Sequence, residues 1–302
     1  MSMLRQVKCL KKKQTPMGIG GKLLVVFLMC LSSAWGGYAA AESAANFDAL
    51  RQRLVDDGFE AAVLAEIYRR PGVRFEVEGV SRFFVHSEAR IDYDQFASAG
   101  SIRSARQYLA EHRPALAAAE RRFGVEPQVI AAIIMVESRF GKLIGRRSVL
   151  SILSTIAALR EATVRDAFLG ALASDRRPTR ARLDRWVNRK SDWAYTELKA
   201  LLKYTGREGI DASEILGSYA GAFGISQFMP TSVQAYARDG NGDGRIDLFD
   251  HADAIASVAS YLKRNGWRPG VTPAQAYKVI YTYNRSRYYV NAILKIRELL
   301  KG

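Results

Sequence analysis

The segment from residue 125 to residue 140 constrains the fold of this 302-residue chain more than any other stretch. It reads VEPQVIAAIIMVESRF. Pro127 suits the first turn of a helix, where its missing N–H costs nothing. Apolar residues then recur with the spacing of one helical face: Val129, Ile130, Ile133, Ile134 and Val136. The pattern predicts a helix that packs a wide apolar face into a core and is capped by Gly141.

Glu137 lies on this apolar face, three residues after Ile134 and four after Ile133. A carboxylate in that position loses hydration, which disfavours its charged form and raises its pKa. A carboxylic acid that stays protonated near neutral pH can donate a proton to a leaving oxygen. Periodicity alone favours a structural glutamate at the rim of the core, turned towards solvent. The catalytic interpretation therefore depends on the rest of the chain.

The charge of the chain suits an acidic partner. The formal net charge is +15, but six of the 45 Lys and Arg residues and none of the 30 Asp and Glu residues lie in residues 1–41. Without that segment the net charge is +9, spread along the chain. No motif that binds RNA or DNA is present, so nucleic acid is not an expected partner. A cell-wall glycan with peptide carboxylates fits the charge.

Residues 1–41 have the three parts of a secretory signal peptide. Three lysines at 11–13 precede the apolar run LLVVFLMCL, and small residues follow up to Ala41. The apolar run is too short to span a bilayer comfortably, so we expect cleavage after Ala41 and export to the periplasm. An uncleaved anchor is the alternative. Both cysteines lie in this segment, so the exported chain is expected to fold without disulfides.

The remaining sequence is typical of a mainly α protein with little strand signal and no internal repeat. Helical spacing covers residues 102–123, with an interruption or a new helix at Pro114. Residues 73–100 are expected to be irregular, with a short strand at 83–85. The basic stretch at 176–190, RRPTRARLDRWVNRK, has two interpretations: a solvated helix, or an arm that touches an anionic substrate. A separate amphipathic helix is expected at 193–202.

A glycine-rich segment, GSYAGAFGISQFMPTS, spans residues 217–232. Its small residues let the backbone approach another helix or a ligand closely. Ser218 and Gln227 offer a hydroxyl and an amide that suit polar sugar atoms. A packing seam is the alternative. The chain has no GxSxG elbow and its histidines lack triad spacing, which disfavours a serine hydrolase.

Residues 239–250, DGNGDGRIDLFD, match the twelve-residue calcium loop at nearly every position, with Gly244 at the sharp turn. The predicted ligands are Asp239, Asn241, Asp243, the backbone carbonyl of Arg245, and Asp250. No second such loop occurs in the sequence, which favours a structural calcium clip over a paired calcium sensor. A turn without an ion is the alternative.

The stretch at 281–290, YTYNRSRYYV, gathers four tyrosines ahead of a helix expected at 290–300. Tyrosine rings stack on the apolar faces of sugars, and asparagine can bond to hydroxyl or acetamido groups. Tyr283 and Asn284 are therefore candidate sugar contacts. An aromatic hinge into the core is the alternative.

In this order the four stretches resemble the membrane-bound lytic murein transglycosylase B family, from about Asn46 to the end. The matching strings are VEPQVIAAIIMVESRFG, GSYAGAFGISQFMPTS, the calcium-type loop with HADAIASVASYLKRNGW after it, and YNRSRYYV. The resemblance implies a lysozyme-like helical domain over residues 42–302, with an N-terminal part at 42–122 and a catalytic core at 123–302. It also implies a periplasmic enzyme that cuts the β-1,4 bond between N-acetylmuramic acid and N-acetylglucosamine in peptidoglycan without water, leaving a 1,6-anhydro end.

By this resemblance Glu137 is the single acid and base. It protonates the glycosidic oxygen and then takes the proton of the 6-hydroxyl as that oxygen closes on C1. Ordinary glycoside hydrolysis uses two carboxylates instead. The resemblance also places four residues in the sugar cleft: Ser218, Gln227, Tyr283 and Asn284. It implies calcium in the loop at 239–250 and no organic cofactor.

Two other functions fit the same residues. A lysozyme-like muramidase would hydrolyse the same glycan, and a non-catalytic peptidoglycan-binding protein would be expected to lack the acid at Glu137. The expected partners are peptidoglycan glycan strands, with association to the outer or inner membrane as a further option. We expect a monomer.

Overall fold

The computed structural model of the chain describes residues 45–85, 91–174 and 177–302. The chain divides between Glu42 and Ser43, and the fold below is that of Ser43–Gly302. The predicted signal peptide, its cleavage after Ala41 and the alternative anchor lie outside the described residues. No helix within the described ranges combines the length and the apolar character needed to cross a membrane.

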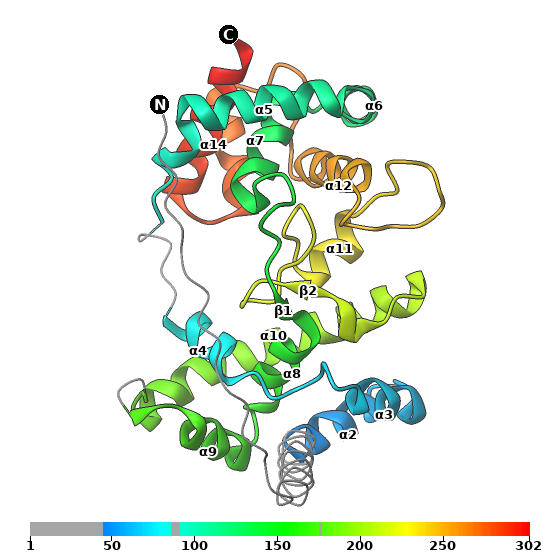
Figure 1. The fold of residues 1–302 in the computed structure, drawn as a ribbon, viewed down its shortest axis with the longest axis vertical. Helices are drawn as coiled ribbons and strands as arrows, with labels where there is room; N and C mark the ends of the chain where they lie inside the picture. Colours follow the sequence, from blue (N-terminus) through cyan, green and yellow to red (C-terminus); the bar gives the residue numbers. More distant parts are fainter. Residues whose placement is uncertain (1–44, 86–90, 175–176) are drawn as a thin grey trace, which may run out of the picture. The chain divides into compact units, whose positions relative to one another are not determined.

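The described chain is mainly helical, which confirms the predicted fold class (Figure 1). The helices are α2 (Asp48–Asp56), α3 (Ala61–Arg69), α4 (Val77–Val85), η2 (Asp94–Ala97), α5 (Ala99–Glu111), α6 (Arg113–Phe123), α7 (Pro127–Ser138), α8 (Val149–Ala158), α9 (Ala162–Ala171), α10 (Arg180–Glu208), η4 (Ala212–Glu214), α11 (Pro230–Tyr236), α12 (His251–Arg264), α13 (Pro273–Tyr283) and α14 (Arg287–Lys301). Two short strands, β1 (Arg147–Ser148) and β2 (Leu216–Gly217), pair antiparallel.

Helix α7 forms the centre of the part of the core that carries Glu137. It packs against α5, α6, α12 and α14 (Figure 1). Every residue from Val129 to Met135 is buried, so the helix is enclosed on all sides rather than along the predicted apolar face alone. Protein cores are close-packed, and an enclosed helix therefore holds the side chains at its end in fixed positions.

Hydroxyl side chains fix the first turn of several helices. The caps that accept a bond from a first-turn N–H are Ser98 for α5, Ser148 for α8, Thr179 for α10, Thr272 for α13 and Ser286 for α14. Each such cap stabilises a helix by about 1 kcal/mol. Helix α6 begins anew with Pro114 in its first turn, one of the two outcomes that the sequence allowed.

Three expectations of secondary structure were wrong. Residues 73–100 are not irregular throughout, since Val77–Val85 form helix α4. Residues 83–85 end helix α4 and form no strand, because Phe83 and Phe84 both pack on Trp186 of α10. The stretches 180–190 and 193–202 are parts of one 29-residue helix, α10. Phe83 also packs on Trp193, so one aromatic side chain spans the two stretches that were expected to be separate.

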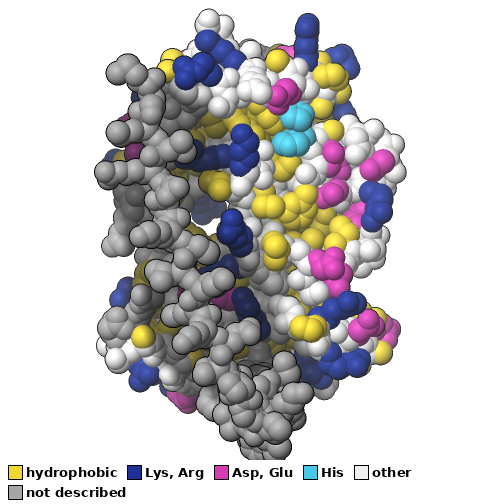
Figure 2. Space-filling model, in the orientation of Figure 1, with side chains coloured by type: hydrophobic (Ala, Val, Ile, Leu, Met, Phe, Trp, Pro, Cys, Tyr) yellow, Lys and Arg dark blue, Asp and Glu magenta, His cyan; other side chains and the backbone are white. Residues whose placement is uncertain are grey.

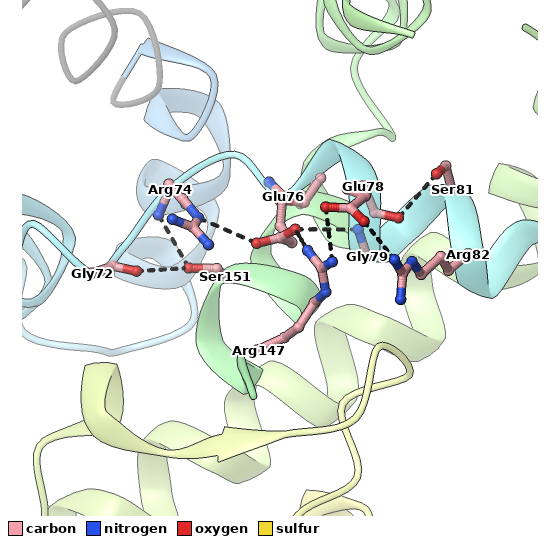
Figure 3. Close-up of polar contacts among 10 residues, drawn as sticks. Gly72, Arg74, Glu76, Glu78, Gly79, Ser81, Arg82, Arg147 and Ser151 are labelled. Atoms are coloured by element: carbon pink, nitrogen blue, oxygen red, sulfur yellow. Dashed lines mark hydrogen bonds and ion pairs between the residues drawn. The ribbon is translucent and has the colours of Figure 1, made fainter. Parts of the chain in front are cut away.

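A buried carboxylate joins the chain around α4 to strand β1 (Figure 3). Glu76 is 4% exposed and accepts hydrogen bonds from Arg147, from Arg74 Nε at 3.3 Å and from the backbone N–H of Gly79 at 3.2 Å. Arg147 also bonds to Glu78 at 2.9 Å, and this guanidinium lowers the pKa of Glu78.

The same contact leads towards the glycine-rich segment. A Cβ at Gly79 would lie 2.4 Å from Ile152 Cδ1 of α8, so glycine lets this part of the chain approach α8 closely. Arg147 lies opposite Gly217 in the β1–β2 pair, and Gly217 opens the glycine-rich segment. The Glu76–Arg147 contact therefore helps to place the start of that segment.

Candidate active site

Glu137 lies in the last turn of α7 and is half-buried. The chain then takes three consecutive left-handed residues: Arg139 at φ 48°, Phe140 at 61° and Gly141 at 81°. The predicted cap at Gly141 was wrong by two residues, because Arg139 itself adopts the left-handed cap conformation. Such conformations cost non-glycine residues on the order of 1–3 kcal/mol and cluster at functional sites.

Aromatic contacts hold the turn after Glu137 in place. Tyr108 of α5 stacks on Phe140 at 4.5 Å between ring centroids, and its hydroxyl bonds to His251 Nδ1 at 3.1 Å. His251 in turn stacks on His112 at 4.4 Å, and the described histidines form one cyan group on the face drawn in Figure 2. Burial lowers the pKa of His251. These contacts tie the turn to α5 and α12, which supports its unfavourable backbone conformation.

Ser138 joins α7 to the glycine-rich segment. Its Oγ donates to the backbone carbonyl of Ile225 at 2.7 Å and accepts from the N–H of Gly141 at 2.9 Å. Gly224 has a φ of 75°, and a Cβ there would lie 2.5 Å from Leu248 Cβ, so glycine is required. The N–H of Ile225 bonds to the carbonyl of Leu248 at 2.8 Å. The segment therefore passes between the end of α7 and the acidic loop at 239–250.

Two tyrosines of the C-terminal stretch lie beside Glu137. Tyr289 donates its hydroxyl hydrogen to Glu137 Oε1 at 2.7 Å, and Tyr283 donates to the backbone carbonyl of Ser226 at 2.7 Å. The two rings stack, with centroids 6.3 Å apart and planes 9° from parallel. Burial raises the pKa of both phenols well above 10, and the Glu137 carboxylate adds to the rise. Both groups therefore remain protonated hydrogen-bond donors at neutral pH.

The glycine-rich segment uses part of the polar capacity of Ser218 and Gln227 for its own structure. Ser218 Oγ accepts from the N–H groups of Ala220 at 3.3 Å and Ala222 at 3.1 Å, so its remaining capacity is to donate its proton. Gln227 Nε2 donates to the carbonyls of Ile144 at 3.2 Å and Gly224 at 2.9 Å. Its Oε1 is the atom left to accept a bond from a ligand.

The structure thus gathers Glu137, the glycine-rich segment and Tyr283 in one place, with Asn284 directly after Tyr283 at the end of α13. The roles of Ser218, Gln227, Tyr283 and Asn284 towards a substrate stay predictions.

Sequence reasoning missed the specific role of Tyr289. It assigned this residue to a cluster of sugar-stacking rings, whereas the structure shows its hydroxyl bonded to Glu137. A signal was available, because Tyr289 begins the apolar face that Val290 and Ile293 continue along α14. A buried tyrosine needs a hydrogen-bond partner, and a half-buried acid is a suitable one.

The acidic loop is organised by its own backbone. Asp239 accepts from the N–H groups of Gly242 at 2.6 Å and Gly244 at 2.8 Å, and these bonds lower its pKa. Asp250 Oδ1 caps α12 by accepting from two N–H groups of its first turn. Among the described residues, no three His, Cys, Asp or Glu side chains form a group that could hold a metal. A cation site in this loop would therefore need the amide oxygen of Asn241 and a backbone carbonyl as well.

A helical fold with a half-buried glutamate at the end of an enclosed helix, faced by a glycine-rich segment and tyrosines, defines a lysozyme-like domain. The chain belongs to the transglycosylase SLT domain family, whose model matches residues 42–276. The predicted resemblance to the murein transglycosylases is confirmed by this match and by the relatives that follow.

The chain is 33% identical over 176 residues to the membrane-bound lytic murein transglycosylase B of Escherichia coli K12, covering 58% of this chain and 41% of that protein. The match therefore spans about two fifths of that relative's length. The crystal structure of the soluble lytic transglycosylase SltB1 of Pseudomonas aeruginosa is 26% identical, with a TM-score of 0.66, and the match covers 85% of this chain and 97% of that one. The Escherichia coli lytic transglycosylase Slt35 in complex with calcium shares the fold, at 23% identity, a TM-score of 0.65 and coverage of 85% and 92%.

Proposed function

We propose that this protein is a lytic transglycosylase of peptidoglycan. It cuts the β-1,4 bond between N-acetylmuramic acid and N-acetylglucosamine without water and leaves a 1,6-anhydro end. The observation that carries the proposal is the hydrogen bond from Tyr289 to Glu137, which orients a proton donor at the end of an enclosed helix beside the glycine-rich segment. Family membership and the names of the relatives support it.

One carboxyl group serves both steps of the proposed reaction. Glu137 protonates the glycosidic oxygen as its bond to C1 breaks, so the leaving sugar departs with a 4-hydroxyl. The Glu137 carboxylate then removes the proton of the 6-hydroxyl while O6 bonds to C1. This balance needs no water and restores the acid for the next cycle. Attack within one sugar avoids the entropy cost of bringing in a second reactant.

Tyr289→Phe should lower the rate of peptidoglycan cleavage about tenfold, because the bond that orients the acid is worth about 1.5 kcal/mol. The phenylalanine ring keeps the stacking on Tyr283. The measurement is the initial rate at saturating and at low peptidoglycan, in which kcat should fall and KM should change little. Tyr288→Phe is the matched control, since that ring is 46% exposed, and it should leave the rate unchanged. Equal rates for all three proteins would remove Tyr289 from the mechanism.

We further propose that four residues bind the sugars around the cut: Ser218 through its hydroxyl proton, Gln227 through Oε1, Tyr283 through its ring and Asn284 through its amide. Ser218 and Gln227 retain this hydrogen-bonding capacity after their bonds within the protein are counted. The half-buried ring of Tyr283 gives an apolar surface that a pyranose face requires, and the buried ring of Tyr289 stacks on it.

We also propose that the loop at 239–250 holds a structural calcium ion. The donor set consists of oxygen atoms alone, as calcium prefers. Asp239, Asn241 and Asp243 would contribute side chains, with the carbonyl of Arg245 and the second oxygen of Asp250. When bound, the ion would stabilise the loop whose Leu248 bonds to Ile225. The calcium complex of Slt35 supports calcium binding within this fold.

Asp239→Ala should abolish the rise in melting temperature that calcium gives the wild-type protein. Calcium at one hundred times its Kd would stabilise the folded state by about 2.7 kcal/mol. Thermal melting in calcium and in chelator measures the difference for each protein. Asp48→Ala, which removes an exposed acid on α2, is the control and should keep the full calcium response. Identical melting curves of the wild-type protein in both buffers would contradict the proposed structural calcium ion.

The remaining predictions are proposals of the same kind. We propose that residues 42–122 form a helical N-terminal part and residues 123–302 the catalytic core. The protein is exported to the periplasm by its signal peptide and acts there as a monomer on glycan strands. The relative in Escherichia coli is named as membrane-bound, which supports association with a membrane.

Mass spectrometry of peptidoglycan digested by the full chain tests the proposed function. We expect soluble fragments whose muramic acid ends weigh one water less than reducing ends. Reducing ends would identify a lysozyme-like muramidase instead. Binding to the wall without any soluble product would identify a non-catalytic binding protein.

A further inference from the structure

A cavity of about 480 Å³ lies between α4, α9 and the start of α10. None of its lining residues belongs to α7, to the glycine-rich segment or to the C-terminal tyrosine stretch. Three arginines line it: Arg82, Arg177 and Arg182. Its apolar walls include Phe84, Phe168 and Leu172. The cavity is therefore a separate site with positive charge and apolar walls.

The arginines of the cavity retain hydrogen-bonding capacity. Arg177 donates to the backbone carbonyl of Leu172 at 3.1 Å, and Arg182 places its guanidinium carbon 4.9 Å from the centre of the Phe84 ring. Neither has a carboxylate partner among the described residues, whereas Arg82 pairs with Glu78 at 2.7 Å. A guanidinium has five N–H donors, so both unpaired arginines can still bind an anion.

The acids near the start of α10 that the structure describes do not neutralise this charge. Asp184 pairs with Arg165 at 3.1 Å and with Arg180 at 3.3 Å, and Asp192 likewise pairs with two arginines from elsewhere in the chain. Exposed arginines on one face of this part of α10 are Arg182, Arg185 and Arg189. A line of positive charge therefore leads from the cavity along the helix.

The position of Arg182 is unfavourable for the helix itself. The first turn of α10 carries arginines and no acid, at the end where the helix dipole disfavours cations. Asp166 and Asp184 compensate Arg180 and raise its pKa, but no acid among the described residues compensates Arg182. Local choices that lower stability without compensation are typical of functional sites.

We propose that this cavity binds the carboxylates of a short acidic peptide, namely the peptide that peptidoglycan strands carry. The proposal rests on the function proposed above, which supplies such a peptide. Guanidinium groups bind carboxylates through paired hydrogen bonds, and the phenylalanine walls suit the methyl groups of alanine residues. A membrane surface fits less well, because Val85 is the one large exposed apolar side chain among the lining residues.

Calorimetric titration of the full chain with a soluble peptidoglycan stem peptide tests the proposal, because this peptide contains no glycosidic bond that the protein could cut. We expect saturable binding that is lost when the peptide carboxylates are amidated. Adding Arg177→Gln and Arg182→Gln should weaken binding about tenfold for each guanidinium removed. Adding Lys203→Gln instead, at an exposed cation further along α10, should change nothing.

Both arginine substitutions should leave the protein folded and the cleavage of peptide-free glycan unchanged, because neither residue touches the Glu137 site. No binding, or equal binding by the double variant, would overturn the proposal. Arginine-dependent binding to phosphatidylglycerol vesicles without peptide binding would also overturn it and would identify a lipid site. Lysis of purified wall by the wild-type protein is measured in parallel, so a failure of the proposed function is recognised separately.

Discussion

Glu137→Gln is expected to reduce the rate of peptidoglycan lysis on the order of 10³-fold, since this is what a positioned proton donor contributes. Glutamine keeps the size of the side chain and an oxygen that can accept the bond from Tyr289. It has no acidic proton, so neither the protonation of the leaving oxygen nor the later proton removal can occur. The measurement is the clearing of a suspension of purified peptidoglycan, with the melting temperature recorded for the same sample.

Glu126→Gln is the control for this experiment. Glu126 lies at the other end of α7 and pairs with Arg297 of α14. Its substitution should leave the lysis rate unchanged, while Glu137→Gln should leave the melting temperature unchanged. A Glu137→Gln protein that lyses the wall at the wild-type rate would contradict the assignment of the acid.

Glu76→Ala is expected to lower the free energy of unfolding by about 3–5 kcal/mol, because removing the buried partner of an ion pair leaves the remaining charge only partly compensated. Glu76 is 4% exposed, and its loss leaves Arg147, which is 20% exposed, with Glu78 alone. The N–H of Gly79 also loses its acceptor. Urea denaturation followed by circular dichroism gives the change.

Glu78→Ala provides the matched comparison, since Glu78 binds the same arginine but is 56% exposed. Its removal should lower the free energy of unfolding by less than about 1 kcal/mol. Equal losses for the two variants would show that burial of Glu76 does not set the strength of this contact.

Several features followed from the sequence because local chemistry determines them. The run of isoleucines in α7 can be stable only in a core, and Glu137 comes at its end whatever surrounds it. Pro114 and Gly224 impose backbone conformations that the structure retains. The order of the four chemistry-bearing stretches was sufficient to predict the family and the mainly helical fold.

Other features depend on partners distant in the sequence. Tyr289 meets Glu137 across 152 positions. The periodicity of α14 places Tyr289 on the buried face, but it does not indicate which acid is its partner. Phe83 lies in helix α4 and packs on Trp186 and Trp193 of α10. Its β-prone neighbours in the sequence alone favoured a strand. The left-handed Arg139 could not be predicted either, since its conformation depends on the packing around Phe140.

The acidic loop at 239–250 and Glu137 are linked by a short series of hydrogen bonds. Leu248 accepts from Ile225, whose carbonyl accepts from Ser138, the residue after Glu137. Gly224 lets the backbone come close enough to Leu248 for the bond between Leu248 and Ile225 to form. Changes that disorder the loop are therefore expected to reach Glu137 through backbone contacts, with no ion near the reacting atoms.

Digestion of peptidoglycan in water enriched in oxygen-18 tests the central claim most directly, because that claim is that one carboxyl group cleaves the strand while the sugar's own 6-hydroxyl replaces water. Mass spectrometry of the new muramic acid ends should show anhydro sugars with no heavy oxygen. Heavy oxygen at C1 of those ends would show that water attacks, and would contradict the account.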